Sequence, residues 1–154
     1  MSKKPDDIDR EPTFGSGSSL DILARTIYGE ARGEYEHIEG GISALIGVGN
    51  VVMNRVKARS WYGKSIEEVC QKPFQFSCWN VGDPNRSLLM REEITDPMFT
   101  LCSEVATKVA LEEWPDLTKG SDHYHAFSIL PHWARGQKPK IRLARHIFYQ
   151  LGRN

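Results

Sequence analysis

Apolar side chains recur at helical spacing from the twentieth residue onward. A first stripe runs over 20–31, on one face of a helix. Ser18 and Asp21 form a capping box, which predicts that this helix begins near Ser19. Its pattern fades at two glycines, so we expect the helix to end at or just beyond Glu30.

A second stretch, residues 42–56, is apolar almost all round, and its length favours a buried helix. A strand is the alternative, because several of its residues are β-branched. Gly47 and Gly49 lower the helix propensity there. We expect them to allow the close approach of a neighbouring element.

Two further helices are marked by their ends. Ser65 caps a short helix that ends near Cys70. Asp96 as N-cap and Pro97 at the first helical position open another helix, which Pro115 ends.

Beyond the last helix the pattern changes to alternation. Residues 122–127 and 145–149 alternate like a small pair of β-strands. The predicted fold class is therefore α+β, mainly α, with a small β element near the C-terminus. Strand geometry puts two pairs of side chains on common faces: His123 with His125, and His146 with Phe148.

Length and composition exclude several classes of protein. The 154 residues suit one compact domain, and 20 basic residues balance 20 acidic ones. This balance gives no general attraction to nucleic acid or to an anionic membrane, and no apolar run approaches the ~20 residues of a membrane span. Three cysteines are too few for a disulfide framework. We expect a polar, flexible tail over 1–18 and a single catalytic domain over 19–154.

The string YGEARGE contains Glu30, the strongest candidate for a catalytic acid. Glu30 lies where the apolar helix meets a loop that contains glycine. A carboxylic acid held near apolar groups, such as Tyr28, retains its proton and can donate it. The alternative is a solvated residue at a helix end. Glu34 is a candidate second carboxylate, since many glycosidases use two. The alternative is a structural residue that caps a loop or pairs with Arg32 or Arg55.

The segment FQFSCW, residues 74–79, combines amide, hydroxyl and aromatic groups, a mixture that binds sugars. The alternative is a core plug of Phe74, Phe76 and Trp79. Gln75 and Ser77 are harder to explain as core, so the predicted substrate-binding set includes Gln75, Phe76, Ser77 and Trp79.

The histidines of the β element permit two interpretations. His123, His125 and His146 are candidate zinc ligands of a metal-dependent amidase or peptidase, although no H-E-x-x-H motif occurs. A polar cleft wall that binds substrate explains the same residues with no metal or other cofactor. We favour the wall, formed by His123, Tyr124, His125, His146 and Phe148.

The ordered motifs of this chain resemble the spore-cortex-lytic, or SleB-type, cell wall hydrolase family. The similarity covers nearly everything from Leu20 onward. Its blocks are ARTIYGEARGE (24–34), NVVMNRV (50–56), EVCQKPFQFSCW (68–79), GSDHYHA (120–126), PHW (131–133) and HIFY (146–149).

This resemblance implies a lysozyme-like fold related to lytic transglycosylases. It implies cleavage of peptidoglycan glycan strands between N-acetylmuramic acid (MurNAc) and N-acetylglucosamine (GlcNAc). The catalytic acid of the family falls on Glu30, which would act as general acid and then as base while a 1,6-anhydro ring closes. The segment 34–44 is longer than the usual connection in the family.

The N-terminal residues lack the apolar core of a secretory signal. We therefore expect synthesis in the cytoplasm and action at the cell wall after release, as for a phage endolysin that passes a holin-type pore or an effector injected by a secretion machine. A non-enzymatic glycan-binding module is a further alternative.

Overall fold

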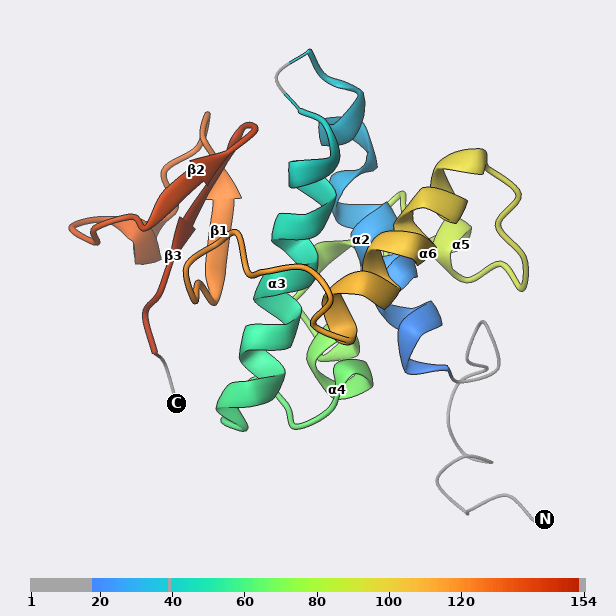
Figure 1. The fold of residues 1–154 in the computed structure, drawn as a ribbon, viewed down its shortest axis with the longest axis horizontal. Coiled ribbons are helices and arrows are strands. Elements are labelled where there is room, and N and C mark those ends of the chain that lie inside the picture. The colour runs from blue at the N-terminus through green and yellow to red at the C-terminus, as the bar shows by residue number, and fades with distance from the viewer. Residues whose placement is uncertain (1–17, 39, 153–154) are drawn as a thin grey trace.

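The computed structural model describes residues 18–38 and 40–152, in which helices dominate (Figure 1). The helices are α2 (Ser19–Glu36), α3 (Ile42–Ala58), α4 (Ile66–Gln71), α5 (Arg86–Leu89) and α6 (Pro97–Ala110), with the short 3₁₀ turns η1 (Ser77–Trp79) and η2 (His132–Ala134). The strands are β1 (His123–Ala126), β2 (Ile141–Leu143) and β3 (His146–Tyr149).

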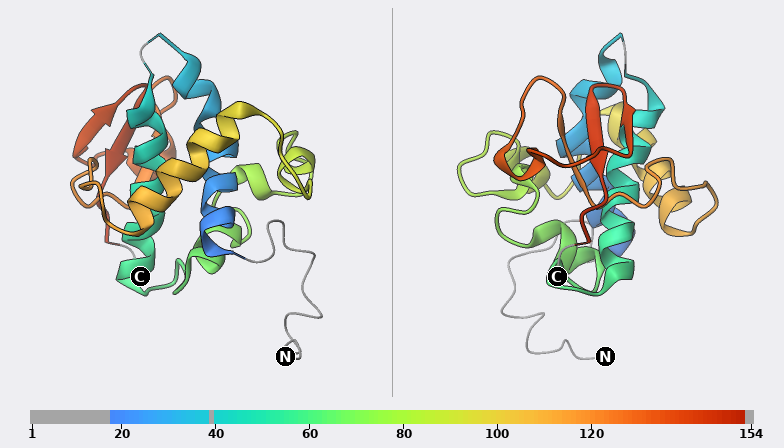
Figure 2. Two further views of the ribbon diagram at one scale, coloured as in Figure 1. Left: turned by 45° about the vertical axis from the view of Figure 1, so that its right-hand side comes forward. Right: turned by 90° about the vertical axis from the view of Figure 1, so that its left-hand side faces the viewer.

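The long helices α2, α3 and α6 pack together around the apolar core, and the small sheet lies beside α3 (Figures 1 and 2). The α+β class, mainly α with a small C-terminal β element, is confirmed. Among the described residues, no helix is both long enough and apolar enough to cross a membrane.

Helix α2 is longer than its sequence pattern indicated. Ser18 accepts the backbone N–H of Asp21, so the predicted start is confirmed. The helix continues through Gly33 to Glu36, and the expected end near Glu30 is therefore wrong. Because Glu34 is buried on the same helix, the extra turn contributes to packing as well as to length.

Helix α3 confirms the predicted buried helix and the role of its glycines. A Cβ atom added at Gly47 would lie 2.7 Å from the Phe148 ring of β3. This distance is too short for a real contact, so glycine is what lets the sheet approach the helix. The strand alternative for this segment is wrong.

For the remaining elements, some of the predicted ends are confirmed and others are wrong. Helix α4 runs one residue past Cys70, while the predicted cap of α6 by Asp96 is confirmed. Helix α6 ends at Ala110, so the expected end at Pro115 is wrong. The chain leaves the helix just beyond it, where Glu112 has a φ of 58°. Neither α5 nor β2 was predicted from the sequence.

The sheet has the strand order β1-β3-β2, with both pairs antiparallel. Its register sets Tyr124 opposite Phe148 and His123 opposite Tyr149. Directly opposed residues share a face, and successive residues alternate between faces. One face therefore presents Tyr124, His146 and Phe148 toward α3, and the other presents His123, His125 and Tyr149.

Candidate active site

Glu30 lies on α2 where η1 packs closely against the helix. A Cβ atom added at Gly29 would lie 2.8 Å from the Cβ of Cys78, so only glycine allows this approach. As a result, the backbone N–H of Cys78 donates to Oε2 of Glu30 over 3.2 Å. The carboxyl group is half-buried and is held from the side of the FQFSCW segment.

The second oxygen of Glu30 is held from the sheet. The hydroxyl of Tyr124 donates to Oε1 over 2.5 Å. Burial, together with the charge of Glu30, raises the pKa of Tyr124 well above its usual value, so the hydroxyl keeps its proton and remains a donor. The Tyr124 ring packs against His146 and Phe148, which fix its position.

Glu34, one helical turn after Glu30, is bound to Arg145. The backbone N–H of Arg145 donates to Oε1 over 2.5 Å, and Nη2 contacts Oε2 at 2.8 Å. Burial by itself raises the pKa of Glu34, but the hydrogen bonds from Arg145 outweigh it and lower that pKa below its usual value. Glu34 therefore joins α2 to the β2–β3 turn, and its oxygens are already engaged.

The FQFSCW segment divides into core and surface. Phe76 and Trp79 are buried, and Nε1 of Trp79 donates to Oγ1 of Thr26 over 2.9 Å. The core-plug interpretation is wrong for Phe74, which is 87% exposed and has a φ of 65°. Ser77 is exposed as well, and it contributes the first residue of η1.

A groove of about 580 Å³ lies beside Tyr124, and we call it the aromatic groove. Three of its lining residues, Gln75, His123 and Tyr124, belong to the substrate-binding set predicted from the sequence. Trp61, Tyr62 and Trp133 were missed, because nothing in the local sequence distinguishes an aromatic side chain that lines a groove from one that packs in the core. The lining residues are Arg55, Trp61, Tyr62, Lys72, Pro73, Phe74, Gln75, His123, Tyr124, Trp133 and Leu151.

Arg55 is a charged residue that the apolar pattern of α3 concealed. Its Nε donates to the backbone carbonyl of Asp122 over 2.8 Å. The guanidinium stacks on the ring of Tyr62 at 4.6 Å and on that of Phe76 at 5.2 Å. Burial lowers the pKa of Arg55, which nevertheless remains charged at neutral pH because arginine starts so high.

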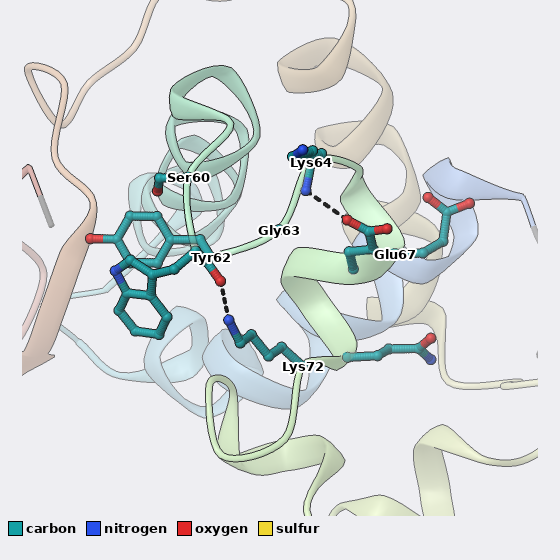
Figure 3. A pocket seen from close by; sticks show the side chains of 9 residues that line it. Ser60, Tyr62, Gly63, Lys64, Glu67 and Lys72 are labelled. Atoms are coloured by element: carbon teal, nitrogen blue, oxygen red, sulfur yellow. Dashed lines mark hydrogen bonds between the residues drawn. The ribbon is translucent and has the colours of Figure 1, made fainter. Parts of the chain in front are cut away.

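A wider depression of about 700 Å³ adjoins the aromatic groove (Figure 3). The two share Trp61, Tyr62 and Lys72. Nζ of Lys72 donates to the backbone carbonyl of Trp61 at this boundary. Tyr124, which donates to Glu30, lines the aromatic groove and does not line the wider depression.

The histidines do not form the metal site that was considered. His146 lies on the α3-facing side of the sheet, whereas His123 and His125 lie on the other side, so the three imidazoles cannot share one ion. No group of three or more candidate ligands is positioned for a metal within residues 18–38 and 40–152. The predicted zinc site of His123, His125 and His146 is therefore wrong.

Each histidine has a separate environment. Nδ1 of His123 lies 2.9 Å from Asp122, and its ring packs against Trp133. His125 is buried, and its Nε2 lies 2.8 Å from the hydroxyl of Tyr149. Only His123 lines the aromatic groove, so the predicted wall of histidines is divided between the two faces of the sheet.

Tyr28 belongs to the interior between α2 and α6. It is 2% exposed, and its hydroxyl donates to Asp96 over 2.7 Å. Burial and the hydrogen bond to Asp96 raise the pKa of Tyr28 to about 12. Its expected role in substrate binding is wrong, because these contacts leave it no surface for a ligand.

A scan against protein-family models matches residues 40–149 to the model described as Cell Wall Hydrolase. The chain belongs to the cell wall hydrolase family. It is therefore an enzyme that degrades bacterial peptidoglycan, and the alternative of a non-enzymatic module is set aside. The matched segment contains α3, the FQFSCW segment and the sheet, while Glu30 precedes it.

Solved structures share the fold of this cell wall hydrolase. The catalytic domain of the SleB protein of Bacillus cereus matches with a TM-score of 0.64 and 20% identity, over 92% of this chain and 98% of that chain. The catalytic domain of the germination-specific lytic transglycosylase SleB from Bacillus anthracis matches with a TM-score of 0.64 and 21% identity, over 91% and 100%. A search of curated proteins gave no match. The expected SleB-type, lysozyme-like fold is confirmed.

Proposed function

We propose that this cell wall hydrolase cleaves the bond between MurNAc and GlcNAc as a lytic transglycosylase, with Glu30 as its catalytic acid and base. The observation that carries the proposal is the position of the Glu30 carboxyl group. It receives hydrogen bonds from η1 and from β1, beside the aromatic groove. Two distant segments of the chain thus converge on one carboxyl group.

The first step is proton donation. The protonated Glu30 gives its proton to the glycosidic oxygen while the bond from that oxygen to C1 of MurNAc breaks. Glu30 is then a carboxylate, and the donors on Tyr124 and Cys78 stabilise its negative charge. Their positions are fixed by packing before the reaction, so they need no reorganisation as the charge develops.

The second step returns the proton. The Glu30 carboxylate removes the proton of the C6 hydroxyl of MurNAc, and the C6 oxygen attacks C1 to close a 1,6-anhydro ring. No water is consumed and Glu30 recovers its proton. The ion pair of Glu34 with Arg145 supports this route, because Glu34 is not free to activate a water as a second carboxylate.

The test is digestion of purified peptidoglycan by wild type, Glu30→Gln and Glu36→Gln. Glu36 is an exposed carboxylate on the same helix and serves as the matched control. Loss of general acid–base catalysis predicts that Glu30→Gln is slower by about 100-fold or more, with unchanged folding. A Glu30→Gln enzyme that stays within a few-fold of wild type contradicts the assignment.

Product masses decide the type of cleavage. Lytic cleavage yields fragments that end in 1,6-anhydro-MurNAc, one water lighter than the hydrolytic products. Reducing MurNAc ends from the wild-type enzyme would refute the lytic route while leaving Glu30 as the acid.

Delivery of the enzyme to the wall during phage-type host lysis, through a holin-type pore or a secretion machine, stays a prediction. Expression in a bacterial cytoplasm with and without a coexpressed holin tests it. Lysis that depends on the holin supports this route, and holin-independent lysis contradicts it.

A further inference from the structure

Two residues that line the aromatic groove each have a buried polar atom without a hydrogen-bond partner. Nε2 of Gln75 donates to the backbone carbonyls of Tyr62 and Val69, over 3.0 Å and 2.6 Å. These two acceptors fix the orientation of the amide. Its other atom, Oε1, is a buried acceptor with no partner.

The second unpartnered atom is a donor. Arg55 is 7% exposed, and its Nε is used by the carbonyl of Asp122. Its Nη1 is buried and without a partner. Buried polar atoms are normally satisfied, and leaving a charged donor unsatisfied is especially unfavourable. An unpartnered donor and an unpartnered acceptor in the wall of one groove indicate a ligand that carries the matching pair.

We propose that the aromatic groove contains a subsite for an N-acetylhexosamine, in which Arg55 and Gln75 recognise the acetamido group. The acetamido carbonyl accepts from Nη1 of Arg55, and the acetamido N–H donates to Oε1 of Gln75. This inference rests on the proposed function, since it names the sugar group that the glycan-cleaving site recognises. It adds a residue, Arg55, that is not required for the chemistry at Glu30.

The rest of the groove suits a sugar ring. Trp61, Phe74 and Trp133 line it, and Trp61 and Phe74 are 48% and 87% exposed. Phe74 has a φ of 65°, a conformation that is unfavourable for a bulky side chain. Its N–H donates to Oδ1 of Asn80 over 3.2 Å, which holds it there. Strain of this kind gathers at binding sites, and flat aromatic faces bind the apolar face of a pyranose.

Both unpartnered atoms are shielded from solvent, so a ligand reaches them only when side chains at the groove surface shift. Phe74 directly precedes Gln75 and packs little surface against the core. It can therefore move at little cost in buried surface. The rings that stack on the Arg55 guanidinium are those of Tyr62 and Phe76, and these must also shift for Nη1 to be reached.

The test is calorimetric titration of Glu30→Gln protein with two neutral β-1,4-linked tetrasaccharides, one of GlcNAc and one of glucose. They differ only in the group at C2, which is acetamido in one and hydroxyl in the other. Two added hydrogen bonds predict that the GlcNAc tetramer binds about tenfold or more tightly. Equal affinities for the two tetramers overturn the proposal.

Three further variants, each in the Glu30→Gln background, separate recognition of the acetamido group by Arg55 from binding of the sugar ring by Phe74. Arg55→Lys keeps the charge but removes Nη1, and we expect the preference for GlcNAc to fall to within about threefold. Phe74→Ala should weaken binding of both tetramers by about three- to tenfold and keep their ratio. Phe127→Ala is the control, because Phe127 is an exposed aromatic outside the groove and should change neither affinity.

An Arg55→Lys protein that folds and keeps the full preference refutes the role of Arg55. If that variant does not fold, Gln75→Ala replaces it, with the same expected loss of preference. Because these titrations involve no catalysis, they are independent of the mechanism. Activity retained by Glu30→Gln would refute the proposed function and leave the result on sugar recognition standing.

Discussion

The close contact between α2 and η1 can be tested with two alanine substitutions on one helix. Gly29 and Gly33 are both interior residues of α2. A Cβ atom at position 29 would lie 2.8 Å from Cβ and 2.9 Å from Sγ of Cys78, whereas at position 33 it would meet nothing within 4 Å. The two substitutions therefore share their effect on the helix and differ only in packing.

The expected changes in the free energy of unfolding combine the helix propensity of alanine with the cost of packing its methyl group. Replacing glycine by alanine in a helix stabilises it by about 1 kcal/mol. Forcing an extra methyl into a packed interior costs about 1–3 kcal/mol. Gly33→Ala should thus raise the free energy of unfolding by about 1 kcal/mol. Gly29→Ala should be less stable than Gly33→Ala by about 1–3 kcal/mol, since the helix term cancels in the comparison.

Activity provides a second readout of the same contact. The Cys78 N–H reaches Glu30 over 3.2 Å, so a displaced η1 loses this hydrogen bond. We expect Gly29→Ala to digest peptidoglycan about tenfold more slowly and Gly33→Ala to match wild type.

Urea unfolding followed by circular dichroism measures the stabilities, and thermal midpoints should shift by about 2–4 °C per kcal/mol. Equal stability of the two variants, within about 0.5 kcal/mol, would show that η1 does not pack on Gly29 as described.

Three other predictions concern residues near Glu30. Tyr124→Phe removes the donor to Glu30, and a hydrogen bond to a charged group predicts a roughly 10- to 100-fold loss of kcat in peptidoglycan digestion, with near-wild-type thermal stability. Glu34→Gln weakens the link to Arg145. Because the folded pKa of Glu34 is lowered, the stability it contributes is present above its usual pKa of 4.5 and disappears as the pH falls through the folded value. The stability difference from wild type should therefore shrink in acid urea titrations, and a constant difference would contradict this. Burial lowers the pKa of His146 from its usual 6.5, so stability is present above pH 6.5 and is lost as the pH falls toward the folded pKa. His146→Phe should flatten the wild-type decline in that range, and an unchanged slope would contradict the burial of a neutral imidazole.

The sequence predicted the parts of the fold that local chemistry determines. Caps at Ser18, Ser65 and Asp96 located three helix starts, since each side chain bonds the backbone two or three residues on. The end of α2 was misplaced because propensity at Gly33 was weighed without the tertiary contact of Glu34. Long-range contacts of this kind have no local signal.

The sequence also predicted only part of the candidate site. Short motifs indicated Glu30, Gln75 and Tyr124, which the fold brings to one region. Arg55 was considered only as a partner of Glu34. Its place in the groove was missed because it lies within an apolar helix, where aromatic rings cover its guanidinium. The opposite faces of His123 and His146 depend on strand register, which a single sequence does not reveal.

The hydrogen bond from Tyr124 to Glu30 joins residues that are 94 positions apart in the chain. A ribosome-bound chain from which only the helices have emerged already contains Glu30 but lacks β1, the strand that supplies Tyr124. Domains emerge N-terminus first during synthesis, so a half-made molecule is chemically incomplete. The hydrogen bond to Glu30 consequently forms only after Tyr124 has emerged and β1 has paired with β3.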